Sequence, residues 1–252
     1  MIYKSNDIVI LQKVRKIMAV RPPQLIVDAR MLYLVWTPED PSAVESLVPN
    51  GLKPNAERSC YINQYVVDEA NQTSNFAEEE SFGAYSLTYL GADLEGLDTE
   101  AGVPGRWWTH YMDSSSHMID YAIEHGVPAS LGKYSTVLDL EKNTLTATTF
   151  DNDVPIIRTT AQVGLDKLER ATGQLRYITR VKGEFMSGRY PFVANLAGEF
   201  NVESFEFLDS NHPVYDLRPA KPLNFTFGFY SPGISFTYPG GEGALYSEPH
   251  GN

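Results

Sequence analysis

The sequence predicts an α+β fold, with a large curved antiparallel sheet or closed β-barrel and a few peripheral helices. Short runs rich in β-branched and aromatic residues recur along the 252 residues, and turn residues separate most of them. Strands and helices do not alternate regularly, as they would around a parallel sheet. Neither a repeat nor a linker divides the chain, so we expect one domain over residues 1–252.

The first half of the chain contains the predicted helices. Apolar residues recur at helical spacing within residues 1–20, and Pro22-Pro23 follows them, so this segment predicts an N-terminal helix. A second, short helix is expected at 40–49, where an acidic first turn precedes a proline. The third occupies residues 113–125 and ends at Gly126. Strands are expected at 25–36, 60–67, 82–90 and 107–112.

The second half of the chain predicts strands only. They are expected at 134–140, 144–150, 154–163, 175–181, 202–207, 224–230 and 234–238. Polar turns such as Glu141-Lys142-Asn143 separate most of them. Residues 241–252 are expected to form a flexible tail.

Composition excludes several classes of protein. A net charge of −12 argues against a nucleic-acid partner, because phosphate backbones attract basic surfaces. The single cysteine, Cys60, forms no intrachain disulfide, no apolar run is long enough to span a membrane, and the N-terminus lacks the apolar core of a signal peptide. We therefore expect a soluble, cytoplasmic protein. No motif or spacing indicates a metal or a cofactor.

Three segments together resemble one enzyme family in their order and spacing. Residues 29–54 contain Arg30 on a strand that leads into a short helix and two Leu/Pro segments. Residues 80–89 begin with Glu80, and residues 112–132 contain a helix, Gly126, Pro128 and Leu131-Gly132. This arrangement is similar to the acetoacetate decarboxylase family. The resemblance implies that Arg30 lies near a substrate carboxylate, that Glu80 is a catalytic glutamate, and that the chain forms a homo-oligomer.

The defining lysines of that family are missing. Where the family has two adjacent lysines, one forming an imine with the substrate ketone, this sequence has Ala129 and Ser130. Neither side chain can form a stable imine, so we expect both residues only to line the substrate pocket. Lys133 offers another amine, but at strand rise it lies roughly 13 Å along the chain from Ala129. Its alternative role is a surface lysine.

Each of the two charged candidates has a structural alternative. Arg30 lies between apolar runs, where a charge needs a ligand or an ion-pair partner such as Asp28 or a glutamate. Glu80 ends a run of three glutamates, which favours a solvated loop, although a regular strand begins directly after it.

An aromatic tract predicts a large apolar pocket. Tyr85 and Trp108 are expected to bind substrate, with Asn63 at a position where the family has a second acidic residue. Because strand side chains alternate, one of His110 and Tyr111 is expected to face inward as a catalytic proton carrier. The alternative for all of these residues is core packing.

The sequence thus leaves three functions open. The first is an enzyme without an imine, which performs dehydration, isomerisation or cyclisation on a β-keto or enone small molecule, as in secondary metabolism. The second is a non-catalytic small-molecule binding protein. The third is a decarboxylase that uses a different amine, such as Lys133.

Overall fold

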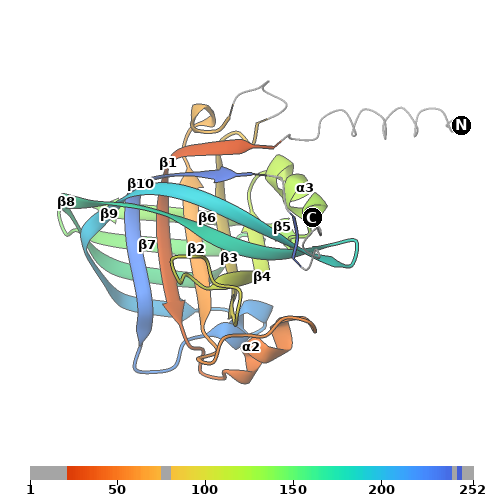
Figure 1. Ribbon diagram of the computed structural model, residues 1–252. Helices are drawn as coiled ribbons and strands as arrows, with labels where there is room; N and C mark the ends of the chain where they lie inside the picture. The colour runs from red at the N-terminus through yellow and green to blue at the C-terminus, as the bar shows by residue number, and fades with distance from the viewer. Residues whose placement is uncertain (1–21, 75–80, 240–242, 246–252) are drawn as a thin grey trace, which may run out of the picture.

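The computed structural model describes residues 22–74, 81–239 and 243–245, and it confirms the predicted α+β fold (Figure 1). One large mixed sheet dominates. Its strands are β1 (Gln24–Trp36), β2 (Cys60–Val67), β3 (Tyr85–Leu94), β4 (Gly105–Asp113), β5 (Ala129–Leu131), β6 (Lys133–Asp139), β7 (Thr144–Asp151), β8 (Val154–Val181), β9 (Glu184–Phe207), β10 (Phe225–Tyr238) and β11 (Gly243–Ala244).

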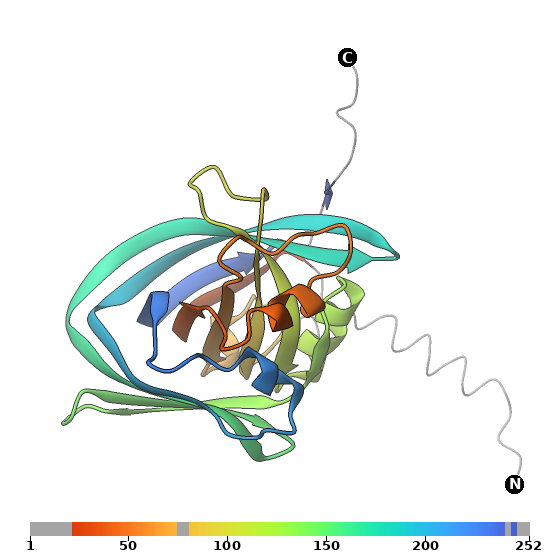
Figure 2. The ribbon, with the colours of Figure 1, turned by 90° about the horizontal axis from the view of Figure 1, so that it is seen from below.

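The sheet closes into a barrel. Neighbouring strands follow the order β9-β10-β1-β2-β3-β4-β8, and β8 pairs with β9 to complete the ring. Most pairs are antiparallel, but β4 pairs in parallel with β8 and with β5. Figure 2 shows the β8–β9 ribbon curving around the central strands, with the β6–β7 hairpin continuing from β8.

Two of the predicted helices lie within the described residues. Helix α2 (Ser42–Leu47) lies at one end of the barrel, and α3 (Ser116–Glu124) lies beside β5 (Figure 1). The Ser115 hydroxyl caps α3 by accepting from the Met118 backbone N–H at 3.4 Å. The described ranges also contain two 3-10 turns, η1 (Ala70–Gln72) and η3 (Pro213–Leu217). The predicted helix at 1–20 lies outside the described residues.

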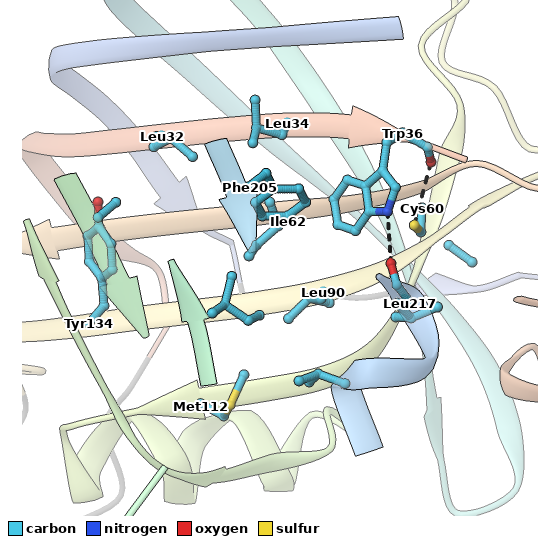
Figure 3. Close-up of a cluster of buried hydrophobic side chains, with 14 of the residues drawn as sticks. Leu32, Leu34, Trp36, Cys60, Ile62, Leu90, Met112, Tyr134, Phe205 and Leu217 are labelled. Carbon is cyan, nitrogen blue, oxygen red and sulfur yellow. Dashed lines mark hydrogen bonds between the residues drawn. The ribbon is translucent and has the colours of Figure 1, made fainter. Parts of the chain in front are cut away.

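Strands β1–β4 are buried on both faces, and each face packs into its own core. Along β1, Met31, Tyr33 and Val35 face the inside of the barrel, whereas Leu32, Leu34 and Trp36 face the opposite side. We call these the inner core and the outer core. The outer core lies between β1–β4 and the layer that contains β6, β7 and Phe205 of β9 (Figure 3).

The strands in the second half are longer than the sequence predicts. The expected strands at 154–163 and 175–181 are one strand, β8, and the expected strand at 202–207 is the end of β9. Much of the added length is polar and exposed, so it lacks the apolar alternation that marks a strand. Mutual β8–β9 pairing satisfies this backbone, and Lys182 and Gly183 turn the hairpin with positive φ angles of 51° and 92°.

Two other expectations meet the structure here. Gly243–Ala244, within the predicted flexible tail, instead pair with Ser187 and Met186 of β9; residues 240–242 and 246–252 lie outside the described part. None of the helices in the described ranges is long and apolar enough to cross a membrane.

Candidate active site

A cavity of about 260 Å³ lies in the inner core of the barrel. Strands β1–β4 and β8–β10 contribute to it, as does the loop between β3 and β4. Aromatic and aliphatic side chains form most of its wall, and Arg106 is the one charged residue among the described residues that line it. The lining residues are Met31, Tyr33, Asn63, Tyr89, Ala101, Val103, Arg106, Trp108, Ala171, Thr172, Gly173, Gln174, Leu175, Tyr177, Tyr190, Phe192, Leu196, Phe227, Phe229, Ile234, Phe236 and Tyr238.

Strand register aligns a row of inner-core residues across the sheet. Each is the cross-strand partner of the next, so their side chains lie on one face as close neighbours. From β10 through β5 the row runs Phe229, Tyr33, Asn63, Tyr89, Tyr111 and Ala129. Ala129, where the family that the sequence resembles has a lysine, therefore lies in the same row as four residues that line the cavity: Phe229, Tyr33, Asn63 and Tyr89.

An irregularity in β4 decides which of its residues face inward. The β3–β4 register shifts between Leu90, opposite His110, and Gly91, opposite Trp108. The extra residue puts Trp108 and Tyr111 on the same face, although regular alternation would put Trp108 with His110. Trp108 and Tyr111 both belong to the inner core.

Arg106 lies at the wall of the cavity in a buried ion pair. Its Nε donates to Asp93 Oδ1 at 3.2 Å, and its guanidinium carbon lies 5.1 Å from the ring centroid of Tyr33 and 5.2 Å from that of Tyr61. Burial acts to lower the pKa of Arg106, but Tyr33 and Asp93 raise it overall, so this side chain stays charged. Burial raises the pKa of Asp93, while Arg106 and the Ser59 hydroxyl oppose that shift.

Two groups of hydrogen-bonded hydroxyls reach the cavity. In the first, the Asn63 amide donates to Tyr89 Oη at 2.7 Å, and Tyr89 Oη lies 2.9 Å from Tyr177 Oη. In the second, Tyr238 Oη lies 2.7 Å from Tyr65 Oη and 3.3 Å from Tyr111 Oη. Tyr85 Oη lies 2.8 Å from Tyr65 Oη and so extends the second group.

These phenols remain protonated at neutral pH. Burial is the largest cause in each case, and it raises the pKa of Tyr89, Tyr177 and Tyr238 above the usual value of a tyrosine. The hydroxyls can therefore donate hydrogen bonds to a ligand, but they do not serve as anionic bases.

A buried carboxyl group lies near the second group of hydroxyls. Asp113, at the end of β4, is fully buried, and its Oδ1 accepts from the Ser115 backbone N–H at 2.6 Å. Its Oδ2 has no hydrogen-bond partner. Burial raises the pKa of Asp113 well above its usual value. Its charged form in turn contributes to the raised pKa of Tyr65 and Tyr111.

Several buried polar atoms in the cavity wall have no hydrogen-bond partner within the described protein. They belong to side chains that are at most 5% exposed, where such an atom costs free energy unless a ligand or water satisfies it. They are Tyr33 Oη, Asn63 Oδ1, Arg106 Nη1 and Trp108 Nε1. Their clustering around one cavity distinguishes this region as the candidate site.

Some of the predicted site residues come together here. Asn63 and Trp108 line the cavity, while Tyr111 and Tyr85 belong to the second hydroxyl group directly behind it. Ala129 packs against the inner core next to Tyr111.

Other predicted residues point elsewhere. Arg30 is not among the lining residues: its Nε and Nη2 donate to Asp68 at 2.8 and 2.6 Å, and it interacts with Tyr230 and Tyr134, which belong to the outer core. This is the ion-pair alternative, with Asp68 as the partner. Alternation along β1 explains it, because Met31 takes the inward position.

Of the pair His110 and Tyr111, Tyr111 belongs to the inner core, and His110 is not among the residues that line the cavity. Burial lowers the pKa of its imidazole to about 4, with a further contribution from His212, so it is neutral at pH 7. Ser130 is exposed and its hydroxyl donates to the Tyr111 carbonyl at 3.3 Å. Lys133 forms a surface ion pair with Asp153, and Glu80 lies outside the described residues.

The sequence reasoning missed Arg106, Asp93, Tyr177 and Tyr238. Asp93 and Arg106 lay in or beside a segment interpreted as a glycine-rich acidic loop, although β3 and β4 both extend into it. One signal was available: Arg106 directly precedes the apolar run Trp107-Trp108, where a charged side chain needs a partner. Nothing in the sequence pairs it with Asp93, which is its cross-strand neighbour. Within the described ranges, no group of three or more His, Cys, Asp or Glu side chains could hold a metal ion.

Comparison with known proteins adds the fold relationship. No protein-family model and no curated protein sequence matches the chain. A structure of acetoacetate decarboxylase is 15% identical, with a TM-score of 0.62, and the match covers 92% of this chain and 93% of that one. The enduracididine biosynthesis enzyme MppR, complexed with the condensation product of pyruvate and imidazole 4-carboxaldehyde, is 12% identical, with a TM-score of 0.62 and coverage of 91% and 92%.

A third neighbour is acetoacetate decarboxylase from Legionella pneumophila. It is 12% identical, with a TM-score of 0.62, and the match covers 86% of this chain and 85% of that chain. At these identities the likeness establishes architecture, whereas the chemistry depends on the residues in the cavity. The chain has the acetoacetate decarboxylase-like fold.

Proposed function

We propose that this protein is an enzyme that performs acid–base chemistry on a β-keto or enone small molecule without forming an imine. Dehydration, isomerisation and cyclisation all pass through an enol or enolate whose oxygen must be stabilised. The observation that carries the proposal is the buried Arg106, with its Nη1 unpartnered in the wall of an aromatic cavity. A preorganised cation in a dry site stabilises a developing oxyanion more strongly than water does.

Neutral hydrogen-bond donors support this role for Arg106. The Trp108 indole N–H has no partner within the described protein and is free to donate. Burial raises the pKa of the Tyr177 hydroxyl, so Tyr177 presents an O–H rather than a negative charge. When the α-hydrogen of a bound ketone leaves as a proton, the electron pair of the C–H bond moves to the carbonyl oxygen. Arg106 and these donors would then hold that oxygen.

Proton transfer needs further groups. Glu80 is our candidate for the base, on the family resemblance described above. For a dehydration, Tyr238 would donate a proton to the departing hydroxide and recover it through Tyr65 or Tyr111.

The cavity wall supports chemistry without an imine. Among its described residues none is a lysine, and the Lys133 amine is held at the surface by Asp153. The neighbour MppR, complexed with the condensation product of pyruvate and imidazole 4-carboxaldehyde, is an example of this fold binding a compound larger than acetoacetate.

The test is enolisation of a ring ketone. We expect the protein to accelerate exchange of the α-hydrogens of 1-tetralone in D₂O, measured by NMR. Arg106→Lys keeps a positive charge but loses the planar fork, so exchange should slow by about 10²-fold. Arg30→Lys is the matched control, since Arg30 pairs with Asp68 outside the cavity, and it should leave exchange unchanged.

Borohydride treatment with the same ketone separates the imine alternative. We expect no covalent adduct by mass spectrometry. A reduced adduct on any lysine would overturn the proposal in favour of amine-dependent catalysis, and equal exchange rates for the wild type and Arg106→Lys would remove Arg106 from the mechanism.

A non-catalytic binding protein is the second candidate. It is favoured by one observation: among the described lining residues none is Asp, Glu, His, Lys or Cys, so the wall itself presents no base. Tight binding of 1-tetralone without any acceleration of exchange would support this candidate over the enzyme.

A further inference from the structure

We propose that the cavity binds a planar, conjugated carbonyl compound or carboxylate that carries a hydroxyl or enol group away from the carbonyl. A small aliphatic keto acid is a poorer fit. This inference rests on the proposed function, because it names the substrate class of the same cavity. It follows from the shape of the wall and from the type and position of the unpartnered polar atoms.

The wall presents flat aromatic surfaces. Trp108 and Tyr177 stack with ring centroids 4.2 Å apart and an interplanar angle of 8°. Tyr33 and Phe229 stack at 5.5 Å and 13°. Flat rings are best complemented by other flat rings, through stacked or edge-on contacts. A volume of about 260 Å³ lies near the lower end for ligand pockets and suits a compound of one or two rings.

One part of the wall offers donors for an acceptor oxygen. The Nη1 of Arg106 and the indole N–H of Trp108 are both buried and unpartnered. Arg106 and Trp108 are two residues apart on β4 and both line the cavity, and a carboxylate has two oxygens with which to accept from these donors. Because Arg106 stays charged, an anionic oxygen is favoured here over a neutral one.

Another part of the wall offers an acceptor. The amide nitrogen of Asn63 donates to Tyr89 at 2.7 Å, which leaves Asn63 Oδ1 as the unpartnered atom. A buried acceptor selects a ligand that carries O–H or N–H, because a ligand without a donor leaves it unsatisfied. Tyr33, the cross-strand partner of Asn63, has an unpartnered hydroxyl and also interacts with Arg106. Tyr33 therefore lies between the acceptor, Asn63, and the charged donor, Arg106.

A calorimetric titration of the full chain with four probes tests this class. 6-Hydroxy-2-naphthoate has the plane, the carboxylate and the remote hydroxyl, and we expect it to bind most tightly. 2-Naphthoate lacks only the hydroxyl and should bind about tenfold more weakly. Decahydro-2-naphthoate is equal in carbon count but not planar, and acetoacetate is small and aliphatic. Both should bind at least tenfold more weakly than 2-naphthoate.

Variants assign the hydroxyl preference to Asn63. In Asn63→Leu the two naphthoates should bind with equal affinity, because the acceptor is gone. Asn63→Ala gives the same comparison with a smaller side chain, in case the leucine does not fit. Ile62→Val is the matched control: Ile62 neighbours Asn63 on β2 but faces the outer core, so the tenfold preference should persist.

The outcomes separate this inference from the proposed function. Equal affinity for decahydro-2-naphthoate or acetoacetate, or a hydroxyl preference that survives in both Asn63 variants, would overturn the substrate class. The expected binding order without any ketone enolisation would leave the substrate class intact and remove the enzyme proposal. Enolisation of ring ketones with no preference among the probes would leave the enzyme proposal intact and remove the substrate class.

Discussion

The two faces of strands β1–β4 treat their buried tryptophans differently. In the outer core, the Trp36 indole N–H donates to the Leu217 carbonyl at 2.8 Å (Figure 3). In the inner core, the Trp108 indole N–H is equally buried and has no partner. Unsatisfied buried donors lower stability, so a fold that retains them around a cavity gives up stability where a ligand can recover it. An unpartnered atom also occurs on the outer face, at Gln64 Oε1, but the four on the inner face line one cavity, where a single ligand can reach them.

The largest expected effect comes from the charged pair of the inner core. Arg106→Met should destabilise the protein by about 3–5 kcal/mol, because it leaves Asp93 buried without its partner. The double variant Arg106→Met/Asp93→Leu should recover most of that loss while ligand binding stays abolished. Urea unfolding measures both. A double variant as unstable as the single one would show that the pair itself contributes to the fold.

Truncation in the outer core should cost about 2–5 kcal/mol without altering the site. Leu34 is fully buried and neighbours Tyr33 on β1, but it faces the other way. Leu34→Ala leaves a void among closely packed side chains. Probe affinity of the folded fraction should be unchanged in calorimetry at a temperature well below unfolding. A weakened affinity would mean that the two faces are coupled.

The two faces should respond to pH in opposite directions, starting with His110. Its pKa falls from about 6.5 unfolded to about 4 folded, so the unfolded chain binds more protons between those values. Stability should therefore be fully present above pH 6.5 and decrease by about 2–3 kcal/mol as the pH falls to 4. His110→Gln should flatten this part of the stability–pH curve, measured by urea midpoints. His212 and Asp216 face the same imidazole and are the groups to hold constant.

Asp113 should produce the opposite trend on the inner side. Its pKa is raised in the folded state, so the protonated form is favoured and the stability it contributes is lost as the pH rises through the folded pKa. Asp113→Asn keeps an oxygen for the Ser115 N–H but cannot ionise. The variant should lose less stability than the wild type as the pH rises above about 4, the ordinary pKa of an aspartate. Identical stability–pH profiles would contradict the predicted shift.

The smallest effect is expected at Tyr33. Its hydroxyl is buried and unpartnered, so Tyr33→Phe should leave stability unchanged or raise it by up to about 1 kcal/mol. Affinity for 6-hydroxy-2-naphthoate should nevertheless decrease. Thermal unfolding and calorimetry on the same sample provide the comparison. A clear loss of stability would mean that the hydroxyl stabilises the fold instead of binding a ligand.

Local sequence signals were sufficient for many elements. Helix α3 ends just before Gly126 as expected, although it begins at Ser116 and not at residue 113, and the apolar runs of β1, β2 and β7 lie where their composition predicts strands. They failed for β8 and β9, whose polar middle portions are strands because each pairs with the other along most of its length. Pairing between distant segments leaves no mark on the local pattern.

The candidate site shows the same division. Sequence reasoning named Asn63, Tyr85 and Trp108 as substrate-binding residues and Tyr111 as a catalytic one. In the structure Asn63 and Trp108 line the cavity, and Tyr85 and Tyr111 belong to the inner core. Sequence reasoning assigned the positive charge of the site to Arg30, which lies one position out of phase with the inward-facing residues of β1. A shift of one residue moves a side chain to the other face of a sheet, so only the register could decide.

By itself, the sequence determined the α+β class, the aromatic character of the pocket and the replacement of the family's two lysines by Ala129 and Ser130. All three depend on residue type alone. Tertiary structure decided which face each side chain takes, that Arg106 meets Asp93, and that the irregularity in β4 turns Trp108 inward and His110 away. These outcomes depend on strand register and on barrel closure between residues far apart in the chain. The chemistry of the cavity follows from both.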